Sequence, residues 1–215
     1  MDSPTTTTTA GFGATPRRGR PPGYDRDAVT AAALDVLWRK GYEATTVNDL
    51  VEATGLSPSS LYGAFGNKSG VMEAALARYD RDRDALLAPL EHGEHGLADI
   101  RRFLAAVRDS MTTAGAVGCF MVSTTAGAAA HDPVLAQRTS AYRARIRDGL
   151  CAALQRATAL GELGDATSRV LRRRALTLQA ALYGAQVARR AGEAAEAAET
   201  VDALEDLLQQ WGAGR

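Results

Sequence analysis

The sequence predicts an all-α protein in which a small N-terminal three-helix unit leads into a larger helical bundle. Alanine and arginine are abundant and aromatic residues make up 6% of the chain, a composition that favours helix. Apolar residues recur at intervals of three and four positions, which is the spacing of one face of a helix. No segment shows the alternating pattern of a β-strand, and no repeat of the solenoid type occurs.

The first 23 residues are rich in threonine, glycine, proline and arginine and offer nothing that could bury a core. Residues 1–23 are therefore expected to form a disordered basic arm. The first helix is expected to run from Asp25 to about Lys40. Asp25 is suited to the N-cap position, and Gly41 is suited to end the helix because glycine tolerates a left-handed backbone.

Two short helices joined by a tight turn follow. The first is expected over 47–54, where either Thr45 or Thr46 can cap it. Gly55 then permits a turn with positive φ. The second is expected over 58–65, because Ser57 can cap it and Pro58 stands at its first position, where the missing N–H costs nothing.

A longer helix capped by Asn67 is expected over 68–87, with Pro89 beyond its end because proline disfavours a helix interior. Start and stop signals predict five further helices, at about 97–113, 118–130, 133–160, 166–191 and 197–211. These elements divide the chain into residues 24–67, the three-helix unit, and residues 68–215, the larger bundle.

The formal net charge is zero, so any contact with nucleic acid has to come from a local arrangement of charge and shape. No apolar run approaches the roughly 20 residues that cross a bilayer, and no signal peptide is visible. The two cysteines, Cys119 and Cys151, have no metal-ligand spacing. We therefore expect a cytoplasmic protein with free thiols, no membrane contact, no metal and no cofactor.

Two short helices that are joined by a glycine turn and packed on a first helix form a helix-turn-helix arrangement. The second helix could enter the major groove of DNA, which is about 12 Å wide and admits one α-helix. Many all-α proteins contain a corner of the same shape, so the geometry alone leaves a purely structural corner as the alternative.

The residues at this corner resemble the DNA-binding signature of the TetR/AcrR family of transcriptional regulators. The resemblance is strongest over residues 45–68, where Tyr62, Lys68 and the glycine turn lie in the family's register, and it extends over residues 25–79. Ser69 stands where the family usually has an acidic residue. The resemblance implies an N-terminal helix-turn-helix DNA-binding domain and a larger ligand-binding and dimerisation domain.

The resemblance also implies roles for single residues, since phosphate contacts hold register and base contacts set sequence preference. Three residues would contact DNA phosphates: Thr46, Tyr62 and Lys68. Four small residues would face the bases: Ser57, Ser59, Ser60 and Gly63. Because this face is short of arginine and asparagine, we expect modest direct readout, with apolar contacts to thymine methyl groups.

The arm carries Arg18 and Arg20 in an Arg-Gly-Arg-Pro segment that resembles the core of minor-groove AT-hook segments. Arginines of this kind can enter a narrow minor groove, as the arms of homeodomains do. A solvated basic tail is the alternative.

Two apolar stripes mark the last two helices, and the family resemblance implies that they form a dimer interface shared by two chains. The stripes comprise Leu178, Leu182, Tyr183, Leu204, Leu208 and Trp211. The alternative is that both stripes face only the core of their own chain. In a dimer, the two reading heads would fit half-sites spaced by the helical repeat of DNA.

The middle helices are expected to enclose a ligand site between them. Its candidate lining mixes aromatic rings, thioethers, a thiol and phenols: Tyr79, Phe103, Val107, Met111, Cys119, Phe120, Met121, Tyr142 and Ile146. Such a lining suits a small, mostly apolar or aromatic effector, although core packing explains each residue taken alone.

The hypothesis that follows is ligand-controlled repression, in which a homodimer binds a double-stranded DNA operator and a small-molecule effector favours a conformation that no longer matches the half-sites. One alternative is a thiol-based redox or electrophile sensor that uses Cys119. Another is an all-α enzyme, although no P-loop, Rossmann or G-x-S-x-G motif is present. A neutral chain disfavours a DNA architectural protein. His92 and His95 could hold a metal, but a solvated loop is the simpler interpretation.

Overall fold

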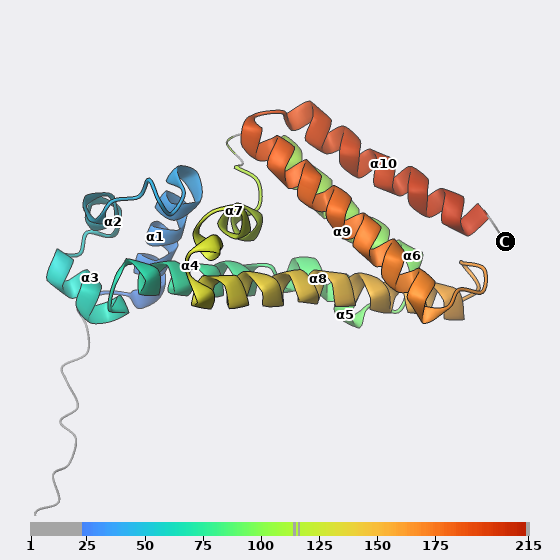
Figure 1. Ribbon diagram of the computed structural model, residues 1–215, viewed down its shortest axis with the longest axis horizontal. Coiled ribbons are helices and arrows are strands. Elements are labelled where there is room, and N and C mark those ends of the chain that lie inside the picture. Colours follow the sequence, from blue (N-terminus) through green and yellow to red (C-terminus); the bar gives the residue numbers. More distant parts are fainter. Residues whose placement is uncertain (1–22, 114, 116, 214–215) are drawn as a thin grey trace, which may run out of the picture.

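The computed structural model describes the chain over residues 23–113, 115 and 117–213. These described residues contain ten α-helices, one 3₁₀ turn and no strand, which confirms the predicted fold class. The three N-terminal helices form one end of an elongated molecule, and the remaining helices form a longer body beside them (Figure 1). The arm, with Arg18 and Arg20, lies outside the described residues.

The three N-terminal helices are α1 (Arg26–Lys40), α2 (Val47–Thr54) and α3 (Pro58–Phe65). They begin after capping side chains that the sequence identifies: Asp25, Thr46 and Ser57. Of the two threonines that could cap α2, Thr46 does so, whereas Thr45 is buried and its hydroxyl donates to the carbonyl of Gly41 at 2.6 Å.

The predicted single helix over 68–87 is wrong, because two helices occupy this segment: α4 (Lys68–Asp82) and α5 (Asp84–His92). The break is at Arg83, whose N–H donates to the carbonyl of Asp80 at 3.1 Å. A bond to the third preceding residue tightens the last turn of a helix and changes the direction of the chain. The sequence signals a break at Pro89, but the chain breaks six residues earlier.

Pro89 lies inside α5 rather than beyond a helix end. Because α5 starts afresh at Asp84, the proline falls in its second turn and deprives this short helix of one backbone hydrogen bond. The carbonyl of Pro89 accepts from the N–H of Gly93 at 3.1 Å, and the guanidinium of Arg156 also donates to the carbonyls of Pro89 and Leu90, at 3.1 and 2.8 Å.

The body of the molecule contains α6 (Leu97–Thr112), α7 (Phe120–Ala126), a 3₁₀ turn (Ala128–Ala130), α8 (Pro133–Ala159), α9 (Ser168–Ala191) and α10 (Ala194–Ala213). The predicted helix over 118–130 is wrong at both ends, because α7 starts later and the 3₁₀ turn follows it. Gly118 has φ +78°, and a Cβ there would lie 2.8 Å from the carbonyl oxygen of Gln186. Two other starts are also shifted: α9 is capped by Thr167 instead of Asp165, and α10 begins three residues earlier than expected.

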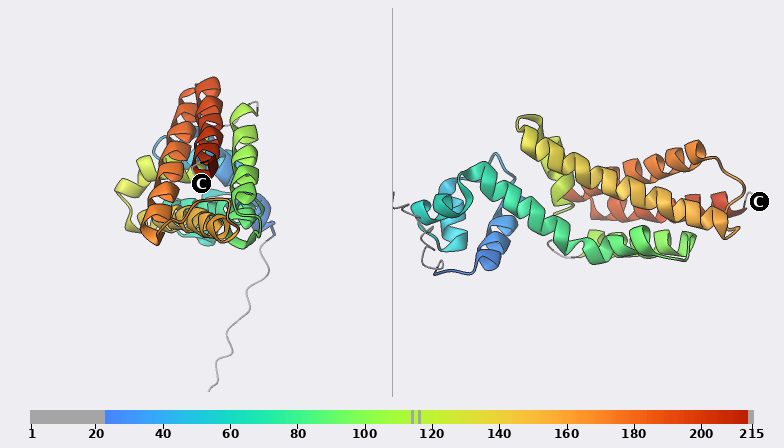
Figure 2. Two further views of the ribbon diagram at one scale, coloured as in Figure 1. Left: turned by 90° about the vertical axis from the view of Figure 1, so that its right-hand side faces the viewer. Right: turned by 90° about the horizontal axis from the view of Figure 1, so that it is seen from below.

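Helix α4 connects the three-helix unit to the body. It packs on α1 and α3 and also contacts α8 (Figure 2). In the body, α9 packs against α8 and α10, while α6 packs against α10 and α5. One continuous core of buried side chains extends from Leu37 in α1 to Leu208 in α10. None of the helices in the described ranges is both long and apolar enough to cross a membrane.

Gly118 offers a direct test of this packing. We expect Gly118→Ala to lower the free energy of unfolding by about 1–3 kcal/mol, because the added methyl group meets a backbone oxygen and the residue has a left-handed backbone. Gly63→Ala is the matched control, since a Cβ there meets nothing within 4 Å and the residue lies inside α3. Urea denaturation should show that the control is unchanged or more stable, by up to about 1 kcal/mol. Equal losses in both variants would contradict the close approach.

Candidate DNA-binding surface and ligand cavity

Helices α2 and α3 form a helix-turn-helix on the core made by α1 and α4. Leu50 from α2 and Leu61 from α3 are fully buried and fix the two helices on that core. Gly55 between them has φ 67° and ψ 8°, and its N–H donates to the carbonyl of Val51 at 2.9 Å. This left-handed cap ends α2 and turns the chain into α3. The face of α3 opposite Leu61 is left at the surface.

The four small residues expected to face bases are all exposed: Ser57, Ser59, Ser60 and Gly63. The hydroxyl of Ser57 accepts from the N–H of Ser60 at 3.1 Å and lies 3.0 and 2.9 Å from the hydroxyls of Ser59 and Ser60. The space around Gly63 is open, since a Cβ there would meet nothing within 4 Å. A partner could therefore approach the backbone of α3 closely.

The three residues expected to contact phosphates are engaged to different degrees. The N–H and hydroxyl of Thr46 both donate to the carboxylate of Asp49, at 2.8 and 2.9 Å, in a capping box. The ammonium of Lys68 lies 4.4 Å from the centre of the Tyr42 ring, and Tyr62 is half-buried. Both donors of Thr46 are therefore engaged within the protein, while the positive charge of Lys68 lies beside the start of α4.

Lys40 is a further cation at this surface that the sequence did not single out. Its ammonium lies 2.7 Å from Oδ1 of Asp49. The hydrogen bond from Lys40, together with those from Thr46, lowers the pKa of Asp49 to about 2. Asp49 is therefore ionised at neutral pH and offsets part of the positive charge near the start of α2.

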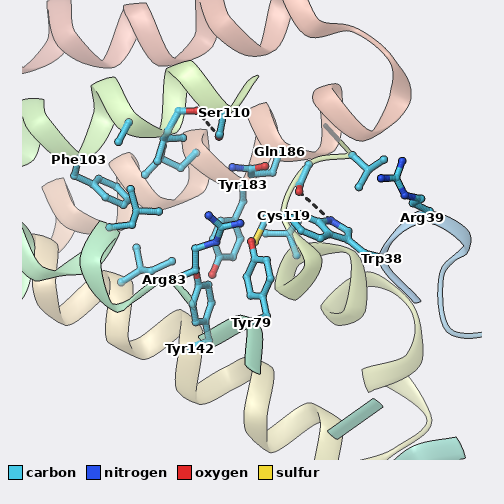
Figure 3. Close-up of a pocket in the computed structure, with 18 of the residues that line it drawn as sticks. Trp38, Arg39, Tyr79, Arg83, Phe103, Ser110, Cys119, Tyr142, Tyr183 and Gln186 are labelled. Atoms are coloured by element: carbon cyan, nitrogen blue, oxygen red, sulfur yellow. Dashed lines mark hydrogen bonds between the residues drawn. The ribbon is translucent and has the colours of Figure 1, made fainter. Parts of the chain in front are cut away.

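A cavity of about 380 Å³ lies where the end of α1, the α4–α5 break, α6, α8, α9 and the segment before α7 meet (Figure 3). Six of the residues expected to line a ligand site do line it: Tyr79, Phe103, Val107, Cys119, Tyr142 and Ile146. Met111, Phe120 and Met121 do not, because they are packed in the core. Phe120 instead lines a second cavity of about 400 Å³, between the α1–α2 turn and α7.

The cavity also receives side chains that the sequence analysis did not assign to it. Trp38 comes from the end of α1, Arg83 from the break between α4 and α5, and Gln186 from α9. The indole N–H of Trp38 donates to the carbonyl of Gly118 at 3.1 Å, across 80 positions of sequence. A contact over that separation leaves no local pattern in the sequence.

Aromatic rings surround Tyr79 on one side of the cavity. Its ring centre lies 5.2 Å from that of Trp38, with the planes nearly perpendicular, and 6.3 Å from that of Tyr142. Edge-to-face arrangements of this kind are favourable because the ring edge is positive and the face negative. The hydroxyl of Tyr79 donates to Sγ of Cys119 at 3.3 Å.

Burial keeps the two phenols and the thiol around Tyr79 uncharged. It raises the pKa values of Tyr79 and Tyr142 well above their usual range. Burial also raises the pKa of the Cys119 thiol, and the hydrogen bond from Tyr79 offsets only part of that rise. At neutral pH these groups are therefore a pair of phenols and a thiol.

The residues expected at a dimer interface lie largely inside the single chain. Leu178, Leu182, Leu204 and Leu208 are buried in its core. Leu182 and Tyr183 line the cavity, and Trp211 is half-buried with the guanidinium of Arg174 5.0 Å from its ring centre. This placement favours the alternative that both stripes cover their own core.

His92 and His95 belong to no group of possible metal ligands in the described part of the chain. Within the described ranges no group of three or more histidine, cysteine, aspartate or glutamate side chains is placed to hold a metal ion. His92 ends α5, and Nδ1 of His95 lies 3.8 Å from Oδ1 of Asp99.

Comparison with known families gives a match at the helix-turn-helix. Residues 29–75 match the family model of "Bacterial regulatory proteins, tetR family". The HTH-type transcriptional repressor ComR of Escherichia coli (strain K12) is 42% identical over 113 residues, which cover 49% of this chain and 52% of ComR. The HTH-type transcriptional repressor BdcR of the same organism is 27% identical over 117 residues, 54% of this chain and 58% of BdcR. The chain thus spans about half the length of these two relatives.

A solved structure resembles the whole fold. The TetR family transcriptional regulator CifR, as a cysteine mutant in complex with 26-bp double-strand operator DNA, superposes with a TM-score of 0.76. Its sequence is 26% identical, and the match covers 90% of this chain and all of that chain. The similarity therefore includes the body of the molecule, where the family model does not reach.

The burial of Cys119 predicts a slow thiol. We expect iodoacetamide at pH 7.5 to label Cys151, which is half-buried, well before Cys119, because the thiolate is the reactive form and burial raises the pKa of Cys119. The pKa of Cys151 is raised as well, so its labelling should accelerate as the pH rises towards and beyond 9.

The variant Cys151→Ser isolates Cys119 for this measurement. Mass spectrometry should find it unlabelled in the native protein and labelled after denaturation. Native labelling of Cys119 at the rate of a free thiol would contradict the burial and would favour the thiol-sensor hypothesis.

Proposed function

The chain belongs to the TetR family of bacterial regulatory proteins, and we propose that it is a repressor that binds operator DNA as a homodimer and releases it when a small molecule occupies the cavity. The observation that carries the proposal is the place of the cavity. Residues from α1 and α4, on which α2 and α3 pack, form part of its wall. The repressor role is supported by the names of ComR and BdcR, and operator binding by the DNA complex of CifR.

In the proposed complex, α3 lies in the major groove. Its exposed serines and the open backbone at Gly63 allow close approach to base edges. Lys68 and Tyr62 would contact phosphates on either side, as would the N–H groups at helix N-termini, where the helix dipole favours an anion. Residues 24–67 would thus read DNA, with α4 shared between them and the ligand-binding and dimerisation domain proposed for residues 68–215.

The outer face of α9 is the surface that we propose for dimerisation. Leu176 and Val187 on this face are 43% and 57% exposed, although large apolar side chains are usually covered. Ala180 and Gly184 lie between them on the exposed side, and a Cβ at Gly184 would meet nothing within 4 Å. Small residues let a second helix approach closely, so this face suits a second copy of α9.

Arg190 of α9 ties the body to the DNA-reading unit. Its guanidinium donates to the carbonyls of Trp38 and Arg39, two of the last three residues of α1, and the second of these bonds is 3.2 Å long. The indole of Trp38 is bonded in turn to Gly118, beside the cavity. On the other side, the hydroxyl of Ser69 at the start of α4 donates to the carboxylate of Asp132, the N-cap of α8, at 2.5 Å. A ligand that moves the cavity wall would therefore act on both α1 and α4.

A thiol sensor on the same scaffold is the second candidate, because Cys119 lines the cavity and could meet an electrophile there. The raised pKa of the buried thiol weighs against it.

A competition gel shift on the DNA upstream of the protein's own gene tests the proposed function. We expect a shift that excess specific duplex removes and scrambled duplex of the same length does not, since base contacts set sequence preference. Footprinting should then locate two half-sites about one helical repeat apart. Equal competition by both duplexes would indicate non-selective binding, and the absence of a shift would indicate that the protein does not bind this DNA. Either result contradicts the proposal.

The role of Arg190 can be tested without a ligand. Arg190→Ala leaves two carbonyls at the end of α1 without their donor, so we expect the free energy of unfolding to fall by about 1–3 kcal/mol. Hydrogen exchange should rise over the last turn of α1. Arg189→Ala is the control, because Arg189 bonds only the carbonyl of Thr113 among the described contacts and touches no helix of the DNA-reading unit. Faster exchange in α1 of the control, or none in Arg190→Ala, would show that Arg190 does not couple the two parts.

A further inference from the structure

The cavity contains a positive charge that no carboxylate of the described chain neutralises. The half-buried guanidinium of Arg83 lies 4.7 Å from the ring centre of Tyr79 and 5.9 Å from that of Trp38. The acidic residues on either side of it in sequence pair elsewhere: Asp82 with Arg78 at 3.5 Å, and Asp84 with Arg145 at 2.9 Å. Asp35, at the rim of the cavity, pairs with Arg39 at 2.9 Å.

Arg145 shows how the same protein treats a cation that serves structure. Its guanidinium contacts the carboxylates of Asp80, Asp84 and Glu91 at 2.6 to 2.9 Å. An arginine is charged at every ordinary pH, and leaving such a charge in a partly dry environment without a partner is costly. Arg83 therefore differs from Arg145, because its positive charge is available to bind an anionic group from outside the described chain.

Two polar atoms at the cavity also lack a hydrogen-bond partner within the described residues. Nε of Arg83 and the hydroxyl of Tyr183 are buried and unpartnered. Arg83 extends into the cavity between Tyr79, Tyr142 and Tyr183, as Figure 3 shows. Buried polar groups in native proteins almost always have partners, so unsatisfied donors that face one space indicate an acceptor that binds there.

The neighbours of Arg83 cannot supply the missing negative charge. Burial raises the pKa values of Tyr79, Tyr142, Tyr183 and Cys119, so all four are neutral at pH 7. The rest of the wall is mostly apolar or aromatic, with Phe103, Val107 and Ile146 among its members; Ser110 and Gln186 are neutral polar residues, and Asp35 at the rim is paired with Arg39. Among the described residues, the cavity thus combines a mostly apolar, ring-sized space with one cation, Arg83, that no carboxylate pairs.

We propose that the effector is a small aromatic molecule that carries one anionic group, such as a carboxylate, and that Arg83 binds this group. The inference rests on the proposed function, because only a ligand that controls DNA binding is an effector. It narrows the class of ligand expected from the sequence, a mostly apolar or aromatic molecule, to one that also carries a negative charge. The volume of about 380 Å³ accommodates one or two rings. Charge-assisted bonds from the guanidinium would hold the anion, and the tyrosine and tryptophan rings would pack on the ligand ring.

The place of Arg83 in the chain gives this contact a consequence. Arg83 is the residue that joins α4 to α5. An anion that draws the guanidinium to a new position therefore acts at the break itself. From this break α4 extends back to Lys68, beside α3.

The test compares each of three carboxylates with its own neutral primary amide: benzoate with benzamide, cinnamate with cinnamamide, and 1-naphthoate with 1-naphthamide. Isothermal titration calorimetry at pH 7.4 on the full chain, without DNA, measures the affinities. We expect at least one carboxylate to bind about tenfold or more tightly than its amide, which is the gain that hydrogen bonds to charged groups provide. No preference in any pair, or no binding by any of the six compounds, overturns the proposal.

Two arginine variants locate the preference. Arg83→Gln should bring the carboxylate-to-amide ratio to about one, while Arg39→Gln, which removes a cation at the rim that is already paired, should leave the ratio unchanged. A ratio that survives in Arg83→Gln, or that is lost in Arg39→Gln, assigns the anion elsewhere and overturns the proposal. Should Arg83→Gln fail to fold, the wild-type ratio and the Arg39→Gln control decide the matter.

The same compounds separate this inference from the proposed function. A carboxylate that binds through Arg83 but leaves the operator complex intact in a gel shift would uphold the anion site and contradict ligand-controlled release. Release of the operator by the neutral amides as efficiently as by the carboxylates would uphold release and overturn the anion site.

Discussion

The packing of α4 on α1 is the constraint on which the rest of the structure depends. Leu50 and Leu61 fix α2 and α3 on this pair, and Tyr79 near the other end of α4 belongs to the cavity wall. The same two helices therefore position α3 and form part of the cavity wall. Protein interiors are close-packed, so the displacement of one side chain in the wall also displaces the side chains packed against it. The proposed DNA-binding surface and the cavity are thus separated along α4 but connected by packed side chains.

The sequence predicts local structure well because caps and turns are local interactions. Asp25, Ser57 and Asn67 bond backbone N–H groups two or three residues ahead, and each stands where it was expected. The break at Arg83 is different. Arginine is a good helix former, so no residue type marks the break, while Pro89 misleads because its own short helix tolerates it.

Tertiary partners explain what the sequence could not supply about the site. Periodicity shows that Leu178, Leu182 and Tyr183 share an apolar face, but it does not show whether that face covers its own core, a cavity or a second chain. Trp38 and Gly118 meet across 80 residues, and both line the cavity. Of the expected lining residues, those of α4 and α8 and two of the three from α6 lie at the cavity, whereas Met111, Phe120 and Met121 are packed in the core.

In the proposed homodimer, a ligand in the cavity should change the distance between the two helix-turn-helix units. Nitroxides on Glu52→Cys, an exposed position of α2, in a Cys151→Ser background report that separation between protomers by double electron–electron resonance. We expect one distance distribution for the ligand-free homodimer and a displaced one when the tightest-binding aromatic carboxylate is added. An unchanged distribution with the carboxylate bound, or no distance between protomers at all, would contradict it.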